Sequence, residues 1–168
     1  MIGGFGEIPW AMVLITLPLA GGMICFLWPG IARLCGLLTV FGVVVAAIGF
    51  GAHLLDHGGF QHTIGGWIAP LGIGLYGDGL SKLLIGTTAL VGLGVSIYAT
   101  GYFPTSQEMK FWPLWLLLLA ALNGLFLSAD IFNLYVTLEM MGLSAVALTA
   151  LPGNRDALKG GMRYLLAT

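Results

Sequence analysis

A single carboxylate stands inside an apolar stretch of membrane-spanning length, DIFNLYVTLEMMGLSAVALTAL, residues 130–151. Glu139 lies about nine residues into this stretch, roughly 13 Å along a helix and therefore near the bilayer midplane. A charged group there costs about 2.5–3.5 kcal/mol on insertion scales and usually faces a bundle interior or a wet cavity on an ion or proton path. We therefore expect Glu139 to change protonation during transport. The alternative is a structural hydrogen bond to a neighbouring helix.

Two further polar features share the helix expected around Glu139. Tyr135 lies one turn before the glutamate and on the same side of the helix. A second set of side chains falls within about 60° of arc at 100° per residue. This polar stripe consists of Asn133, Thr137, Met140 and Ser144. It either lines a hydrated path or bonds back to its own helix and packs against neighbours, and the sequence leaves both interpretations open.

Four other charged residues are candidates for the same path. Asp78 and Lys82, four residues apart in YGDGLSKLL, have the order of a helical acid–base pair. We favour a helix start or a membrane-edge anchor for them over a role in ion movement. Lys159 and Arg163 have the same spacing near the end of the chain. Ordinary positive charge on the cytoplasmic side is favoured for them over a charge in a proton path.

Three polar residues are expected to support helices. Asp130 should cap the helix that contains Glu139, and Asn154 should cap the next one. Asn123, inside an apolar stretch, should bond between helices.

The composition requires these residues to be positioned by membrane-spanning helices. Hydrophobic residues make up 58% of the 168 residues and charged residues only 8%, whereas soluble domains carry roughly 25% charge. Five segments are long enough to span a bilayer at about 20 residues each. They are residues 10–28, 34–55, 83–103, 111–129 and 131–151. We therefore predict a single all-α membrane domain of five transmembrane helices, with the start of a sixth at 155–168.

Basic residues predict the orientation of these helices. Five of the six Lys and Arg residues follow the first, third or fifth span, and only Lys82 lies after the second. The N-terminus should therefore lie outside and the segment around Arg155 in the cytoplasm. Residues 56–79 are rich in glycine and predict an extracytoplasmic loop or hairpin, in which His57 and His62 are expected to be solvated.

Motifs for bond-breaking chemistry are missing from the sequence. It contains no Gly-rich phosphate loop, no CxxC pair and no Ser–His–Asp candidate, so we expect no cofactor in this chain and no chemistry by it alone. Cys25 and Cys35 are expected to be buried apolar residues rather than a disulfide or a metal site. The net charge of −1 argues against a nucleic-acid partner.

The stretch ADIFNLYVTLEMMGLSAVAL also resembles the fifth helix of the antiporter-like membrane subunits. GGWIAPLGIGLYGDGLS resembles the hairpin before their third helix, SIYATGYF the end of that helix, and ALKGGMRYLLAT the opening of the sixth. The family includes the D subunit of Mrp-type sodium/proton antiporters, the L, M and N subunits of complex I, and their relatives in membrane-bound hydrogenases. The resemblance covers residues 60–168, and NLYV with the following glutamate is closest to the Mrp D type.

The resemblance implies a subunit of a multisubunit complex that moves protons or cations across the inner cell membrane. In it Glu139 is implied to pair with a lysine on a seventh helix. Family members have about fourteen helices in two inverted repeats, so we expect a split or truncated subunit whose remaining helices, with that lysine, come from elsewhere. The implied partners are other membrane subunits, lipid, protons and, in the antiporter branch, Na⁺.

The sequence leaves three alternatives open. The chain could belong to the membrane arm of a redox-driven proton pump, such as complex I or a membrane-bound hydrogenase, and so to an oxidoreductase. It could belong to a related inorganic-carbon uptake complex. It could also be a structural or assembly helix bundle with no transport of its own.

Overall fold

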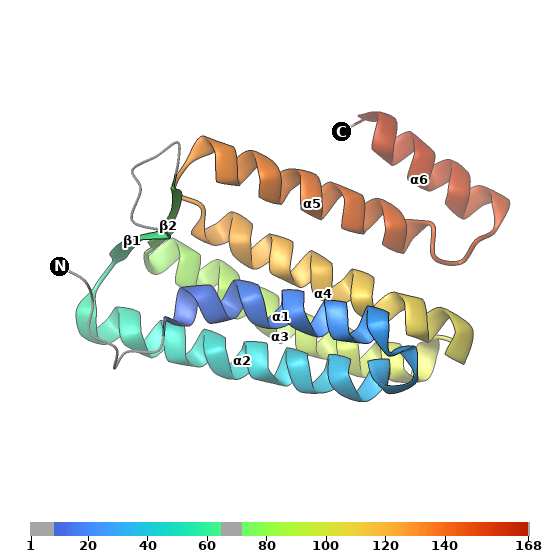
Figure 1. Ribbon diagram of the computed structural model, residues 1–168, viewed down its shortest axis with the longest axis horizontal. Helices are drawn as coiled ribbons and strands as arrows, with labels where there is room; N and C mark the ends of the chain where they lie inside the picture. Colours follow the sequence, from blue (N-terminus) through green and yellow to red (C-terminus); the bar gives the residue numbers. More distant parts are fainter. Residues whose placement is uncertain (1–8, 65–71, 168) are drawn as a thin grey trace.

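The computed structural model, which describes residues 9–64 and 72–167, contains five long helices lying side by side and a shorter sixth (Figure 1). The long helices are α1 (Trp10–Leu27), α2 (Ala32–His57), α3 (Gly79–Tyr102), α4 (Thr105–Leu127) and α5 (Ile131–Thr149). Each is long and apolar enough to cross a membrane. The sixth helix, α6, covers Arg155–Ala167. The predicted all-α membrane fold of five spans and a short sixth helix is confirmed.

The start of α4 lies six residues before the predicted boundary at 111. The Pro104 carbonyl accepts hydrogen bonds from the N–H groups of Gln107 and Glu108, each at 2.9 Å, so the first turn closes within a polar segment. Hydropathy marks where apolar residues begin, whereas the helix begins where its hydrogen bonds can close. The early start places Glu108 inside α4.

Asp130 fixes the start of α5 and ties it to a small hairpin. Its Oδ1 accepts a hydrogen bond from the Asn133 N–H at 2.7 Å, which confirms the predicted cap. Its Oδ2 accepts one from the Gly74 N–H at 3.0 Å. Gly74 belongs to β2 (Ile73–Gly77), which pairs antiparallel with β1 (Phe60–Ile64) within the segment predicted as a loop or hairpin. One carboxylate therefore joins the hairpin to the helix that carries Glu139.

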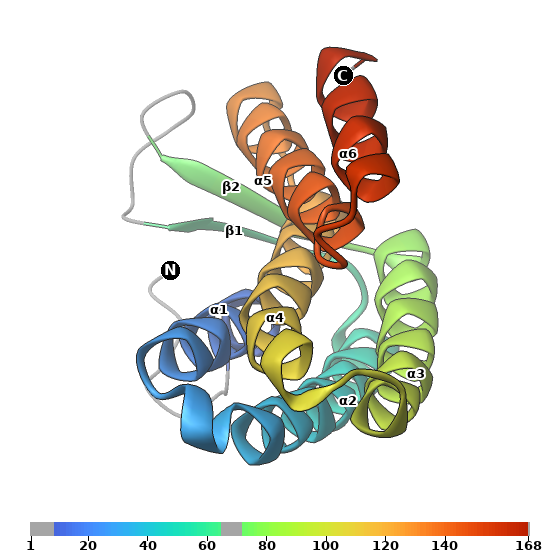
Figure 2. The same cartoon turned by 90° about the vertical axis from the view of Figure 1, so that its right-hand side faces the viewer.

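Helix α4 lies at the centre of the bundle and packs against α1, α2, α3 and α5 (Figure 2). One buried cluster lies toward the hairpin end and includes Leu14, Phe50, Ile85 and Leu127. A second lies toward the other end, where Trp112 packs with Cys25, Val40 and Leu116. A three-residue 3₁₀ turn, η1 (Pro29–Ile31), connects α1 and α2 beside this second cluster.

Two more of the predicted polar roles are confirmed. The Asn123 Nδ2 donates a hydrogen bond to the Leu14 carbonyl of α1 at 2.8 Å. The Asn154 Oδ1 accepts one from the Ala157 N–H at 2.8 Å and so caps α6. Cys25 is buried, Cys35 is half-buried, and both thiols are free.

Candidate functional site

Helix α5 has two unlike faces. It packs against α4 and α6, and it lies on the outside of the four-helix group formed by α1 to α4 (Figure 2). Among the described residues of this helix only Thr137 and Ser144 are buried, so just one narrow strip is covered. Glu139 is exposed on the other face, and Tyr135 is 61% exposed there. The described helices therefore do not enclose this carboxyl.

Glu139 occupies the ninth position of the 19-residue helix α5. The Tyr135 side chain, one turn earlier, interacts with its carboxylate. Within residues 9–64 and 72–167 no basic side chain forms an ion pair with Glu139. The structure thus pairs two of the predicted site residues and leaves the cationic partner implied by the family resemblance outside the described helices.

The polar stripe of α5 is turned toward α4, away from Glu139. The Thr137 Oγ1 donates to the carbonyl oxygens of Asn133 and Leu134 at 2.9 and 3.0 Å. The Ser144 Oγ donates to the Met140 carbonyl at 2.7 Å. These bonds satisfy the hydroxyls within their own helix and let that face pack. The placement favours the packing interpretation of the stripe over a hydrated path.

Close packing of α5 on α4 depends on a small residue. A Cβ at Gly124 of α4 would lie 2.9 Å from the Thr137 Cγ2. Such a separation is too short for a normal contact, so glycine permits the approach of the two backbones, as is common between membrane helices.

Asp78 and Lys82 do not form the ion pair that their spacing suggests. The Asp78 Oδ1 accepts hydrogen bonds from the N–H and the Oγ of Ser81, at 2.8 and 3.0 Å, and caps α3. The Ser81 N–H, as the main cause, lowers the pKa of the Asp78 carboxyl below its ordinary value. The Lys82 stem lies over Gly51 of α2, where an added Cβ would meet its Cε at 3.3 Å. The geometry supports a helix start for Asp78 and an anchored stem for Lys82.

Lys159 and Arg163 are both exposed on α6. The opposite side of α6 approaches the end of α5 at Gly161, where an added Cβ would lie 3.6 Å from the Ala150 Cβ. Neither basic side chain forms an ion pair with Glu139 in the described part of the chain. Their placement fits surface charge at this end of the bundle.

A buried carboxylate near the start of α4 was not predicted from the sequence. Glu108 is only 8% exposed, and its Oε1 lies 3.6 Å from the Arg33 Nε at the start of α2. The same oxygen accepts a hydrogen bond from the Trp112 Nε1 at 3.4 Å. Pro104, followed by Glu108 in a first helical turn, was the signal that could have placed this residue inside a helix.

A histidine pair at the end of α2 was not predicted either. His57 is the last residue of α2 rather than part of a loop, and its ring stacks on that of His53 with centroids 4.6 Å apart. Their spacing of four residues was the available signal. Among the described residues no group of three or more His, Cys, Asp or Glu side chains is arranged to hold a metal ion.

Five apolar spanning helices around a central α4 define a multi-pass helical membrane protein. Comparison with known proteins narrows this class. The chain is 35% identical over 105 residues to the D subunit of the Na(+)/H(+) antiporter of Bacillus subtilis, covering 62% of this chain and 21% of that protein. It is 39% identical over 110 residues to the N subunit of the NADH-quinone oxidoreductase of Desulforudis audaxviator, covering 64% and 22%. No protein-family profile matches it.

The fold of the chain is also similar to that of a solved membrane-complex subunit. A chain of the membrane-bound sulfane sulfur reductase, an archaeal respiratory membrane complex, superposes with a TM-score of 0.83 and 27% identity, covering 93% of this chain and 33% of that one. The chain is therefore similar in sequence and fold to the antiporter-like membrane subunits. It spans about a fifth of the length of the two curated relatives and a third of the structural one, which fits their N-terminal part.

Proposed function

We propose that this chain forms the N-terminal part of a proton- or cation-translocating subunit, most like the D subunit of an Mrp-type antiporter, in which Glu139 carries protons. The observation behind the proposal is a carboxyl in the middle of α5, on the face that α4 does not cover. A carboxyl facing lipid at that depth costs several kcal/mol, so it belongs against protein or water.

The rest of the α5 surface supports the same conclusion. Large apolar side chains surround Glu139 on the uncovered face, among them Leu138 and Leu143, which are 42% and 58% exposed. The relatives are several times longer than the matched region. Helices beyond the described residues, in this polypeptide or in another subunit, would cover the face and supply a basic partner for Glu139.

The test of this proposal is Glu139→Gln in the assembled complex. Glutamine keeps the size and the hydrogen-bonding capacity of the side chain but cannot release a proton. Cation-driven proton movement in inverted membrane vesicles should fall to the level of vesicles without the protein, while the complex assembles normally. Transport equal to that of the wild type would exclude Glu139 from the path, and loss of assembly would favour the structural alternative.

A matched control uses an acidic residue away from α5. Asp156→Asn on α6 removes one exposed carboxylate and should leave transport intact. If both variants lose transport to the same extent, the effect comes from charge in general rather than from Glu139.

A second candidate is the membrane arm of a redox-driven proton pump. Two similarities support this candidate: the 39% identity to a quinone oxidoreductase subunit and the likeness to a chain of a respiratory membrane complex. Mass spectrometry of the complex purified through this chain would separate the two. Iron–sulfur or nickel subunits would identify the pump, and small membrane subunits without redox centres would identify the exchanger.

A further inference from the structure

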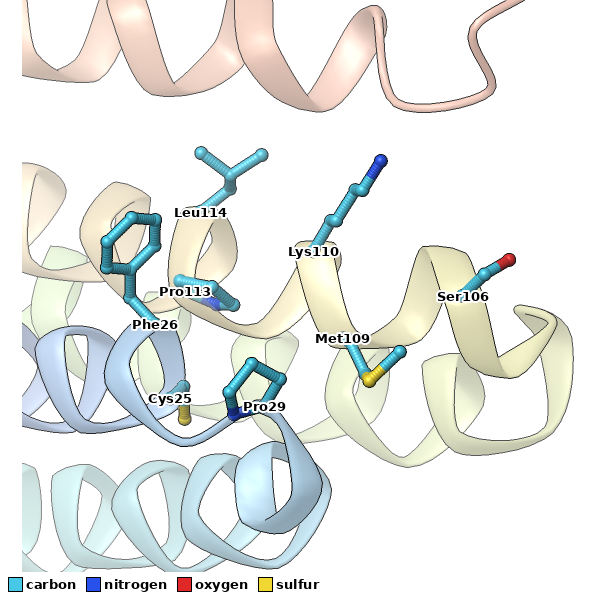
Figure 3. A pocket seen from close by; sticks show the side chains of 8 residues that line it. All are labelled: Cys25, Phe26, Pro29, Ser106, Met109, Lys110, Pro113 and Leu114. Atoms are coloured by element: carbon cyan, nitrogen blue, oxygen red, sulfur yellow. The ribbon is translucent and has the colours of Figure 1, made fainter.

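An apolar pocket of about 440 Å³ opens between the end of α1 and the start of α4 (Figure 3). Figure 3 shows Phe26 of α1 beside Pro113 of α4, with Pro29 of η1 next to them. Deeper in the bundle the two helices touch, because an added Cβ at Gly22 would lie 3.3 Å from the Pro113 carbonyl oxygen. The helices therefore diverge toward their ends, and the pocket is the space that their divergence leaves.

The lining of this pocket changes from polar to apolar along α4. Ser106 and Lys110 stand toward the start of the helix, whereas Pro113 and Leu114 follow one to two turns deeper (Figure 3). Ser106 and Leu114 are eight residues apart, about 12 Å along the helix axis. The deep end offers a ligand apolar side chains, whereas the shallow end offers a hydroxyl and an ammonium group.

The charge at the shallow end is positive. Lys110 is exposed, and it forms no ion pair within the described residues. The nearby Glu108 carboxylate is engaged by Arg33 at 3.6 Å. The Lys110 ammonium is therefore left to attract an anion from outside the chain.

We propose that this pocket binds one anionic phospholipid, with an acyl chain against Phe26, Pro113 and Leu114 and its phosphate beside Lys110 and Ser106. A phospholipid has the same order of chemistry along the membrane normal, from charged head to hydrocarbon. The predicted orientation places this end in the cytoplasmic leaflet, where anionic lipids concentrate and each nearby lysine contributes measurably to their binding. A soluble anion would leave the apolar depth of the pocket unfilled.

Native mass spectrometry of the complex purified in mild detergent tests the proposal. Phosphatidylglycerol should be retained in preference to phosphatidylcholine with the same acyl chains. Lys110→Gln should weaken phosphatidylglycerol retention by about fivefold and remove the preference over phosphatidylcholine. Leu114→Trp, which fills the deep end, should reduce retention of both lipids. Arg155→Gln serves as the control, because Arg155 is an exposed cation at the start of α6 that does not line the pocket.

Three results would overturn the assignment. One is equal retention of the two lipids by the wild type. Another is a loss in Arg155→Gln as large as that in Lys110→Gln, which would show nonspecific attraction to charge. The third is release of a protein subunit, rather than of lipid, by Leu114→Trp, which would assign the pocket to a partner protein.

Discussion

The Asn123 Nδ2 lies 2.8 Å from the Leu14 carbonyl oxygen, the acceptor that Pro18 leaves without its helical donor. In an α-helix this carbonyl would accept the N–H of the residue four positions on, and proline has none. A side chain of α4 thus completes the hydrogen bonding of α1 in the interior of the bundle. Asn123 is 1% exposed, and its Oδ1 has no partner among the described residues.

This relationship predicts that Asn123 and Pro18 are energetically coupled. Asn123→Leu should lower the free energy of unfolding by about 1 kcal/mol, because the buried Leu14 carbonyl loses its donor. Pro18→Ala restores a backbone N–H to that carbonyl, so the same Asn123 change should cost less in that background. The expected coupling energy is about 0.6 kcal/mol, the mean for such bonds between membrane helices. Unfolding by SDS in mixed micelles measures all four variants, and a coupling near zero would contradict the arrangement.

A second prediction concerns the packing of α2 on α4 at Gly36. A Cβ at this position would overlap the indole of Trp112, a fully buried side chain. Gly36→Ala should therefore lower the free energy of unfolding by about 1–3 kcal/mol, the range for overpacked cores. Gly94→Ala in α3 is the matched control, since an added Cβ there meets nothing within 4 Å. Equal stability of the two variants in the same unfolding assay would show that α2 and α4 do not meet as described.

The sequence predicted those features that depend on neighbours along the chain. The spans and the caps at Asp130 and Asn154 follow from apolar length and from side chains that bond three residues on. The sequence predicted that Asn123 bonds to another helix. It did not predict the acceptor, because that depends on how α4 crosses α1. The pair of Arg33 and Glu108 was missed for the same reason, because residues 75 positions apart meet only through tertiary packing.

For the candidate site, too, the sequence predicted what depends on neighbours along the chain and missed what depends on tertiary packing. The position of Glu139 within its span, and Tyr135 one turn before it, follow from helical periodicity. Which face of α5 packs against α4 depends on Gly124 opposite Thr137, a contact that periodicity alone does not reveal.

A third prediction concerns acid conditions. Hydrogen bonds from Ser81 hold the pKa of the Asp78 carboxyl below its ordinary value in the folded protein. The ionised cap therefore adds stability above the unfolded pKa, near 4, and this contribution is lost as the pH falls through the lower folded pKa. Asp78→Asn keeps a capping side chain that does not titrate. The stability difference between wild type and variant should shrink from pH 7 to pH 3 in SDS unfolding, and a constant difference would contradict this role.

A fourth prediction concerns what covers the exposed face of α5. A photo-crosslinking amino acid at Leu138, one residue from Glu139 and 42% exposed, should react with a protein segment outside residues 9–167 in the assembled complex. The same probe at Met140, a half-buried member of the polar stripe, should react with α4 and so verify that the chain is correctly folded. Peptide mass spectrometry identifies both adducts. If Leu138 yields only lipid adducts while Met140 reacts with α4, the face is lipid-exposed, and Glu139 would lack the protein environment that proton translocation at the midplane requires.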